Sequence, residues 1–314
     1  MTDDFSWTNK QRIHQYRIDQ KEKWGTKGPY KIDSDIVDST IVPSTGTKYF
    51  DYLPQYLSTV TLGTGTDPVL WSQLTGIENG TFVKGGFQRG TAVGFALQVL
   101  VDSEVGYTTS YILSPTGQQT KPAHLPGPEV PNSWGQLNGI NNLGQTVGQY
   151  MGFYDNTVTN KSDCPLGEGC GIYYKSPNKK PIYLSYPSTS DLSWTDLISI
   201  NDAGWIVGSY WNYDSSDQST HCVLYKPDAE GNYSNPIPFD PPGGGGGQCG
   251  GINGMGQIVG FGADGAAFVD DAEGGDPANP QNFQTLPSPP SSSAFDSFVP
   301  NGINNNGLVP SCIS

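Results

Sequence analysis

Short runs of alternating hydrophobic and polar residues recur along the chain, and one pattern returns several times. An Ile-Asn-x-x-Gly turn separates two such runs in the copies Ile140–Tyr150, Ile200–Tyr210 and Ile252–Phe261. A truncated copy covers Ile303–Val309, and a degenerate one covers Ile77–Val83. The copies begin at residues 77, 140, 200, 252 and 303, so they are 63, 60, 52 and 51 residues apart. A repeat of this length indicates a supersecondary unit that is used several times.

Each repeat is predicted to contain four short strands. Two strands flank the Asn-x-x-Gly turn, because Asn and Gly tolerate the positive φ angles that a tight hairpin requires. Third and fourth strands are expected over Gly171–Lys175 and Pro181–Leu184, His221–Tyr225 and Pro236–Phe239, and Ala266–Val269 and Phe283–Leu286. Four antiparallel strands in roughly 50–60 residues are typical of a propeller blade. The motif copies therefore predict an all-β fold, a five-bladed β-propeller with four-stranded blades.

The last blade is predicted to be completed by the other end of the chain. The final motif copy is followed by the chain end at Ser314 after about two strands. We expect Lys48–Pro54 and Thr59–Leu62 to supply the missing strands of that blade. This arrangement leaves no large exposed strand edge. The propeller domain then covers residues 48–314.

Residues 1–47 are interpreted as an N-terminal arm. Ile13 and Tyr16 share one side of a helix predicted over Thr8–Trp24, for which Asn9 is a candidate cap. Two roles are consistent with this basic segment. It is either a solvated helix packed on the acidic propeller, or a lid or partner-binding arm.

The motif resembles the HAF repeat of presumed extracellular proteins, whose pattern is Gly-Ile-Asn-x-x-Gly-x-Ile-Val-Gly-x-Tyr followed by His-Gly-Phe. Gly139–Tyr150, Ile200–Tyr210 and Gly251–Phe261 match the first part, and His221-Cys222-Val223 loosely matches the second. The resemblance covers residues 77–310. It implies a fold and no catalytic residues.

Charge and hydropathy exclude some partners. The net charge of −14 and pI of about 4.4 argue against nucleic-acid binding, which requires a basic surface. Solubility is the simplest interpretation of the acidic balance. No stretch approaches the roughly 20 apolar residues of a membrane-spanning helix.

Other features indicate a secreted protein. We expect a protein of the secretory pathway. Met1–Asp4 is not a signal peptide, and the leader is therefore expected to be absent from this chain. Glycosylation sequons begin at Asn79, Asn160 and Asn232, although chance supplies some in a chain of this composition.

The cysteines predict one disulfide directly. Cys164 and Cys170 lie in one loop, where a small disulfide would restrain the chain. Cys249 and Cys312 flank neighbouring motif copies and can lie close together, which leaves Cys222 as a buried hydrophobic residue. The three histidines are far apart in sequence, so no zinc site is expected.

Aromatic and polar residues recur at equivalent positions and predict a binding site. The position six residues before the motif isoleucine holds Trp71, Trp134 and Trp194, and the position four before holds Gln73, Gln136, Asp196 and Gln248. Ten residues after it stand Phe87, Tyr150 and Tyr210, and Phe153 and Trp211 follow in the upper loops. We predict an aromatic pocket at the mouth of the central channel, in which the aromatic residues bind an apolar substrate. The amides and carboxylate would be its catalytic groups, orienting a carbonyl or hydroxyl. Alternatively, the tryptophans wedge between neighbouring blades.

The chain lacks the motifs of common enzyme classes. It has no Gly-x-Ser-x-Gly elbow, His-x-x-x-His metal pair, phosphate-binding loop or dinucleotide fingerprint. No repeat-to-repeat pattern selects a pair of carboxylates for glycoside hydrolysis. We therefore expect no cofactor and no metal, and a reaction accelerated by orientation and hydrogen bonding.

In general character, a sequon-bearing chain without these motifs but with an aromatic mouth resembles the fungal hetero-Diels–Alderases. That resemblance implies the joining of a tropolone-type quinone methide to a humulene-type sesquiterpene in secondary metabolism. No catalytic motif is shared. The alternatives are a secreted carbohydrate-binding propeller lectin and a non-catalytic surface protein.

Overall fold

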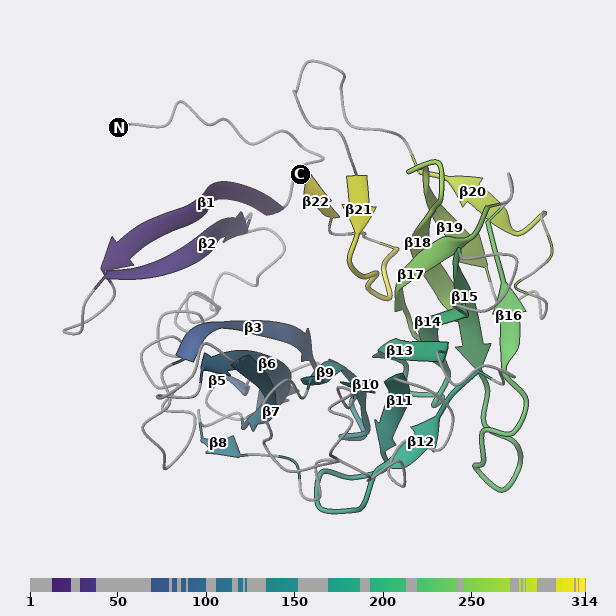
Figure 1. Ribbon diagram of the computed structural model, residues 1–314, viewed down its shortest axis with the longest axis horizontal. Helices are drawn as coiled ribbons and strands as arrows, with labels where there is room; N and C mark the ends of the chain where they lie inside the picture. Colours follow the sequence, from purple (N-terminus) through teal and green to yellow (C-terminus); the bar gives the residue numbers. More distant parts are fainter. Residues whose placement is uncertain are drawn as a thin grey trace. The chain divides into compact units, whose positions relative to one another are not determined.

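The computed structural model describes residues 13–23, 29–37, 69–78, 81–83, 86–88, 90–99, 106–114, 118–120, 122, 134–151, 169–186, 193–212, 219–241, 245–271, 277, 279, 281–286, 298–307, 309 and 311–313. The regular secondary structure of these residues consists of β-strands alone, which confirms the predicted all-β class (Figure 1). The chain divides into two compact units. One comprises residues 1–64 and 80–89, and the other comprises residues 65–79 and 90–314.

The described residues of the first unit form two antiparallel strand pairs. β1 (Ile13–Lys23) pairs with β2 (Pro29–Val37), and β4 (Thr81–Val83) pairs with β5 (Gly86–Gln88). The helix predicted over Thr8–Trp24 is therefore wrong where the structure describes that segment. A helical pattern read from a few apolar positions neglects a partner strand, which satisfies the backbone of β1 through inter-strand hydrogen bonds.

The second unit contains four successive antiparallel meanders, each formed by one sequence repeat. Their strands pair in chain order: β3 (Val69–Ile77), β6 (Ala92–Val99), β7 (Gly106–Leu113) and β8 (Gln119–Thr120); β9 (Trp134–Ile140), β10 (Thr146–Met151), β11 (Gly169–Tyr174) and β12 (Ile182–Leu184); β13 (Ser193–Ile200), β14 (Ile206–Asn212), β15 (Thr220–Tyr225) and β16 (Ile237–Phe239); and β17 (Gly247–Ile252), β18 (Gln257–Gly262), β19 (Ala267–Asp271) and β20 (Phe283–Thr285). The prediction of four strands per repeat is confirmed for these four copies.

The second and third meanders join at one parallel bridge between Gly169 and Trp194, which gives an 8-stranded sheet. The last motif copy contributes β21 (Phe298–Pro300) and β22 (Ser311–Ile313), paired as a 2-stranded sheet. The segments predicted to complete it, Lys48–Pro54 and Thr59–Leu62, lie outside the described residues. We call the first strand of each meander (β3, β9, β13 and β17) its inner strand.

The motif asparagine builds the turn that follows each inner strand. Asn141 Oδ1 accepts the backbone N–H groups of Leu143 and Gln145 at 3.1 and 3.0 Å. Gly144, with φ of 73°, takes the left-handed conformation that this turn requires. Asn253 makes the same pair of bonds in its own repeat, at 3.0 and 2.9 Å. The Asn-x-x-Gly spacing thus encodes a side-chain-capped turn.

The same asparagine side chains also bind the next repeat, and we call this contact the asparagine clamp. The Nδ2 group of Asn141 donates to the carbonyl of Asn201 at 2.9 Å. The Nδ2 group of Asn201 donates in turn to the carbonyl of Asn253 at 3.0 Å, and that of Asn253 donates to the carbonyl of Asn304 at 3.1 Å. Asn141, Asn201 and Asn253 are all buried. Each amide therefore satisfies one turn and one neighbouring repeat at once.

A bulge recurs on each inner strand two residues before the motif isoleucine. The register with the second strand shifts there, and it skips residues 75, 138, 198 and 250. Opposite the bulge, a Cβ on Gly148 would lie 1.9 Å from the carbonyl oxygen of Gln136. A Cβ on Gly208 would lie 2.1 Å from that of Asp196. The motif therefore requires the glycine of its Val-Gly pair, because a side chain at that position would clash with the bulged strand.

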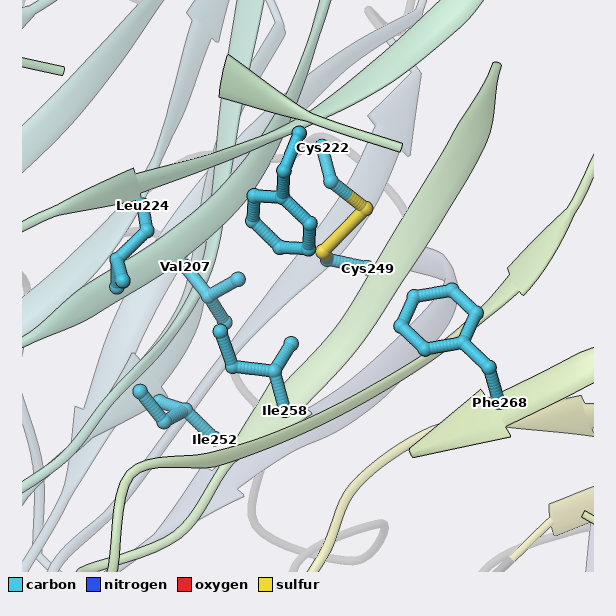
Figure 2. Close-up of a cluster of buried hydrophobic side chains, with 8 residues drawn as sticks. Val207, Cys222, Leu224, Cys249, Ile252, Ile258 and Phe268 are labelled. Carbon is cyan, nitrogen blue, oxygen red and sulfur yellow. A yellow bond between two sulfur atoms is a disulfide. The ribbon is translucent and has the colours of Figure 1, made fainter. Parts of the chain in front are cut away.

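The hydrophobic core consists of clusters between neighbouring meanders. One joins residues of the first and second meanders, including Val93 and Leu137, and another joins the second and third, including Val147 and Leu197. A further cluster joins the third and fourth, and comprises Val207, Cys222, Leu224, Phe239, Cys249, Ile252, Ile258 and Phe268 (Figure 2). A single meander cannot bury its apolar side chains by itself, so each repeat is stabilised by packing against its neighbour.

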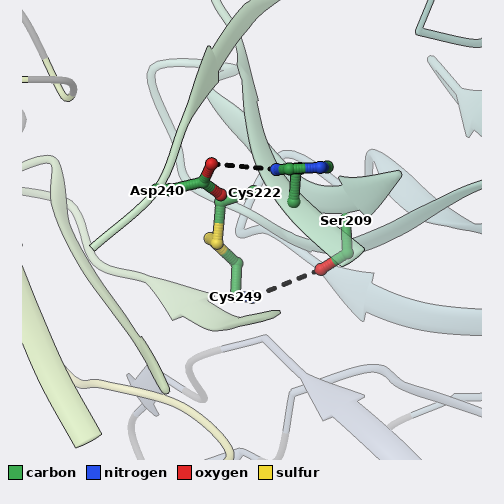
Figure 3. Close-up of a disulfide and its surroundings, with 5 residues drawn as sticks. Ser209, Cys222, Asp240 and Cys249 are labelled. Carbon is green, nitrogen blue, oxygen red and sulfur yellow. Dashed lines mark hydrogen bonds and ion pairs between the residues drawn. A yellow bond between two sulfur atoms is a disulfide. The ribbon is translucent and has the colours of Figure 1, made fainter. Parts of the chain in front are cut away.

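A disulfide crosses this last cluster. Cys222 on β15 bonds to Cys249 on β17, with a Cα–Cα distance of 5.6 Å. Figure 3 shows it beside Ser209, whose hydroxyl accepts the backbone N–H of Cys249 at 3.3 Å. The expectation that Cys222 is left over is therefore wrong, since it is the partner of Cys249. Sequence spacing does not show that the third strand of one repeat packs against the first strand of the next.

We expect Asn201→Ala to lower the free energy of unfolding by about 2–4 kcal/mol. The substitution leaves the N–H of Trp205 without its side-chain partner, at a cost of about 1–3 kcal/mol. It also removes one of the two hydrogen bonds of the Asn253 carbonyl, which still accepts the N–H of Gly256. Chemical denaturation provides the measurement. The exposed Asn235, whose side chain is hydrogen-bonded to Ser234 and to no other described residue, is the matched control. Equal effects of Asn201→Ala and Asn235→Ala would contradict the clamp.

Candidate functional site

The inner strands β9, β13 and β17 each have one buried and one more accessible side. On β13, Trp194 and Asp196 are partly exposed, whereas Thr195 and Leu197 between and beside them are buried. Gln136 and Asn138 are likewise partly exposed on β9, and Gln248 is exposed on β17. Because side chains alternate along a strand, these residues form one row per strand. We call this side the inner-strand face.

A hydrogen-bonded chain across two repeats sets the orientation of two amides on this face. The indole Nε1 of Trp194 donates to Gln149 Oε1 at 2.9 Å, and Gln149 Nε2 donates to Gln136 Oε1 at 3.1 Å. An indole N–H can only donate, so it determines which end of the Gln149 amide faces it. Gln149 in turn determines the orientation of Gln136. The Nε2 group of Gln136 is left without a partner among the described residues.

Two tryptophans form an aromatic surface beside these hydrogen-bonded amides. Trp194 on β13 and Trp211 on β14 are directly opposite each other in the antiparallel pairing, so both side chains lie on the same side of the sheet. Both are partly exposed. The indole of Trp194 therefore lies at the junction of the second and third repeats, bonded to one repeat and carried by the other. This position agrees with the wedge alternative and still leaves part of the ring accessible.

Asp196 is held next to this surface by the preceding repeat. Asn138 Nδ2 donates to Asp196 Oδ1 at 2.7 Å and to the carbonyl of Leu197 at 3.0 Å. Burial raises the pKa of Asp196 to about 7, and the bond from Asn138 offsets only part of this rise. Asp196 Oδ2 has no hydrogen-bond partner in the described part of the chain. Near neutral pH this carboxyl is therefore both a donor and an acceptor.

The predicted tyrosines lie on the other side of the sheet. Tyr150 pairs opposite Gly135 and is buried in a core cluster, and Tyr210 pairs opposite Thr195. The ring of Tyr210 stacks on Tyr186, with centroids 3.8 Å apart. The repeat spacing predicts their position along the strand correctly but not the side of the sheet that they face. The residue one position earlier, Gln149, is the one that reaches the inner-strand face.

Phe87 is not equivalent to the two tyrosines. It lies on β5 and pairs with Phe82 in a hairpin inserted between β3 and β6. In the first meander the position of Tyr150 is taken by Ala96, which pairs opposite Ser72. The degenerate motif at Ile77 concealed this insertion.

Several predicted residues are only partly described. Trp71 and Gln73 lie on β3 and Trp134 begins β9, as expected for inner strands, but their side chains lie outside the described part. Phe153, Cys164, Asn79 and Asn160 also lie outside it. Cys170 is disulfide-bonded, and Cys164, its predicted partner, lies outside the described residues.

Sequence reasoning missed Gln149 and Asn138. Gln149 stands nine residues after the motif isoleucine, where the equivalent residues are Ser209 and Phe261, so no repeated polar type marks it. Asn138 stands at the bulge, where the other repeats have Thr75, Ile198 and Gly250. Alternation from Gln136 could have placed Asn138 on the accessible side.

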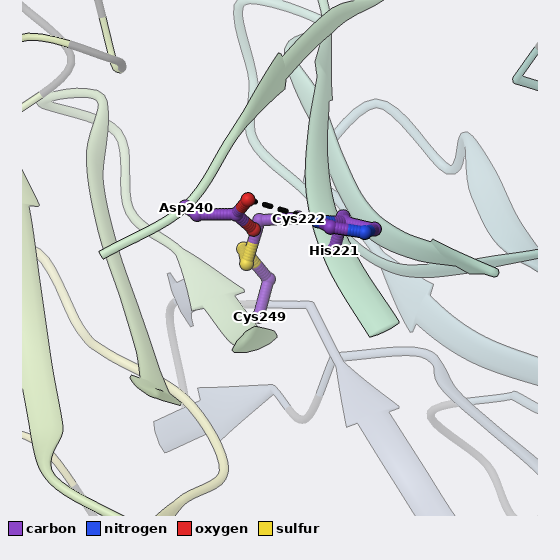
Figure 4. Close-up of polar contacts among 4 residues, drawn as sticks. All are labelled: His221, Cys222, Asp240 and Cys249. Carbon is purple, nitrogen blue, oxygen red and sulfur yellow. Dashed lines mark hydrogen bonds and ion pairs between the residues drawn. A yellow bond between two sulfur atoms is a disulfide. The ribbon is translucent and has the colours of Figure 1, made fainter. Parts of the chain in front are cut away.

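A second polar pair lies close to the disulfide. His221 Nδ1 is 2.8 Å from Asp240 Oδ2 (Figure 4), and the imidazole stacks on Tyr210 with centroids 5.2 Å apart. His221 is adjacent in sequence to Cys222 and pairs opposite Tyr210. These contacts brace the junction at β14 and β15.

Within the described ranges, no group of three or more His, Cys, Asp or Glu side chains is arranged to hold a metal ion. The same residues include no helix of the length and hydrophobicity needed to cross a membrane. A scan of the sequence against protein-family models and a search of curated proteins found no match.

The raised pKa of Asp196 has a consequence for stability. Its carboxyl binds a proton in the folded chain up to about pH 7, whereas the unfolded chain releases it near 3.8. Stability contributed by this group is therefore present at low pH and decreases as the pH rises from about 4 to 7. Because the residue is partly exposed, we expect a loss of about 1–2 kcal/mol. Thermal denaturation of Asp196→Asn should lack this decrease, and identical pH profiles of the two proteins would contradict the assignment.

Proposed function

We propose that the chain is a five-bladed β-propeller that binds a carbonyl-bearing apolar molecule on its inner-strand face and catalyses a cofactor-free hetero-Diels–Alder cycloaddition. The chain of hydrogen bonds from Trp194 through Gln149 to Gln136, next to the Asn138–Asp196 pair, is the observation that carries this proposal. The repeated four-stranded meanders and the five motif copies support the propeller.

The binding part rests on three polar atoms that the described protein does not itself use. Gln136 Nε2 is a donor, Asn138 Oδ1 is an acceptor, and Asp196 Oδ2 is either, according to its protonation. They adjoin the partly exposed Trp194 and Trp211. Small-molecule sites typically combine aromatic surface with a few oriented polar groups. A flat conjugated ligand would stack on an indole while its carbonyl oxygen accepts from Gln136 and Asp196.

The reactive part follows from what these groups supply. In the cycloaddition, a C=C–C=O heterodiene and an alkene form one C–C and one C–O bond, and no atom or proton is gained or lost. The protein need only align the two partners and withdraw electron density from the carbonyl. Preorganised donors aimed at the carbonyl oxygen perform the second task. A quinone methide of the tropolone type and a humulene-type sesquiterpene are the proposed partners.

Carbohydrate binding is the second candidate. Tryptophan with amide and carboxylate neighbours is equally suited to a sugar ring, and Gln248 occupies on β17 the position of Gln136. However, Gly246 replaces the tryptophan in that repeat, so the repeats do not offer equivalent sites. This asymmetry favours one site for one small molecule.

Product stereochemistry tests the proposal directly. With the quinone methide generated in solution in the presence of the sesquiterpene, we expect the protein to give an enantioenriched adduct, because the bound partners meet in one orientation. Asp196→Ala should lower the catalysed rate at least about tenfold. We expect the native rate to decrease as the pH rises through 7, because Asp196 then loses its proton. Asp196→Asn keeps a neutral donor, so it should retain activity without this decrease.

Lys179→Ala, at an exposed turn, is the control for general effects of substitution. A racemic adduct formed at the uncatalysed rate would contradict catalysis. Saturable binding of an oligosaccharide on a glycan array, at several equivalent sites, would instead support the lectin.

A further inference from the structure

The turn between β15 and β16 presents the Asn232-Tyr233-Ser234 sequon on the outside of the protein. Asp228 organises this turn: its Oδ1 accepts the backbone N–H groups of Glu230 and Asn232 at 3.0 and 2.7 Å. The Asp228 N–H donates to the Asn232 carbonyl at 2.8 Å, and Gly231, with φ of 84°, allows the reversal. The backbone before the sequon is thus held by Asp228.

Tyr233 anchors the middle of the sequon to the protein. Its hydroxyl donates to the carbonyl of Gly204 at 2.8 Å, and its ring lies edge-on to Tyr173 at a centroid distance of 5.2 Å. Tyr233 is partly buried, whereas Asn232 and Ser234 on either side are exposed. The anchored tyrosine therefore leaves the asparagine amide and the serine hydroxyl facing solvent.

The amide nitrogen of Asn232 is not needed by the fold. Its contact is a long one, 3.4 Å to Asp228 Oδ2, and the turn is held by backbone atoms and by the Asp228 carboxylate. The clamp asparagines are the opposite case, since Asn201 and Asn253 are buried and donate to the next repeat. A glycan on Nδ2 of a clamp asparagine would disrupt the clamp. The turn at Asn232 has no such bond to lose.

We propose that Asn232 is a site of N-linked glycosylation. In this transfer, Nδ2 loses one proton and bonds to the anomeric carbon of an oligosaccharide, whose lipid diphosphate carrier leaves. The Cys222–Cys249 disulfide is compatible with the oxidising compartment in which this transfer takes place. The other two sequons, at Asn79 and Asn160, lie outside the described residues. The inference does not depend on the proposed cycloaddition.

Peptide mapping of the full chain tests the proposal. The chain is directed to the secretory pathway of a yeast by a leader, and the peptide that contains Asn232 is analysed by mass spectrometry from both secreted and cell-retained protein. We expect a glycan on this peptide, removable by a peptide N-glycosidase. Asn232→Gln and Ser234→Ala should each abolish this glycan. After enzymatic deglycosylation of all three proteins, both variants should have the same thermal midpoint as the native chain.

Asn235→Gln is the matched control, because this neighbouring exposed asparagine is followed by Pro236 and lies outside any sequon. It should leave the glycan in place. An unmodified Asn232 peptide in both fractions would overturn the proposal, and so would a glycan that persists in Ser234→Ala.

Discussion

The asparagine clamp is the contact on which the rest of the second unit depends. One amide group caps the turn of its own hairpin and donates to the backbone of the next repeat, as Asn141 does to Asn201. These asparagines are buried, and each clamp hydrogen bond contributes on the order of 0.5–1.5 kcal/mol to stability. The clamp therefore specifies both the local turn and the spacing of neighbouring inner strands, which hydrophobic packing alone would not determine.

The candidate site follows from that spacing. Once β9 and β13 lie beside each other, Asn138 reaches Asp196 and Trp194 reaches Gln149, so two of the contacts that orient groups on the inner-strand face join neighbouring repeats. The same proximity removes water from the Asp196 carboxyl and raises its pKa. The hydrogen bond from Asn138, which stands at the bulge, offsets only part of this rise. Stability and site chemistry thus have one structural origin.

The repeated motif predicted the all-β class, the four-stranded repeats and the inner strands, because alternation and turn residues are local signals. It also placed Gln136, Trp194 and Asp196 at equivalent positions on the accessible side. What it could not predict depends on contacts between repeats: the side of the sheet reached by Tyr150 and Tyr210, the role of Gln149, and the Cys222–Cys249 disulfide. The strand at Ile13–Lys23 was missed for a related reason, since its partner β2 lies further along the chain.

The central claim is that contact between repeats builds and desolvates the site, and the protonation of Asp196 reports on it directly. A carbon-detected NMR titration of the side-chain carboxyl, in the native protein and in Asn235→Ala as a surface control, measures this pKa. The account predicts a midpoint at about 7 in both proteins. A midpoint near 3.8, the ordinary value for aspartate, would show a solvated carboxyl and contradict the account.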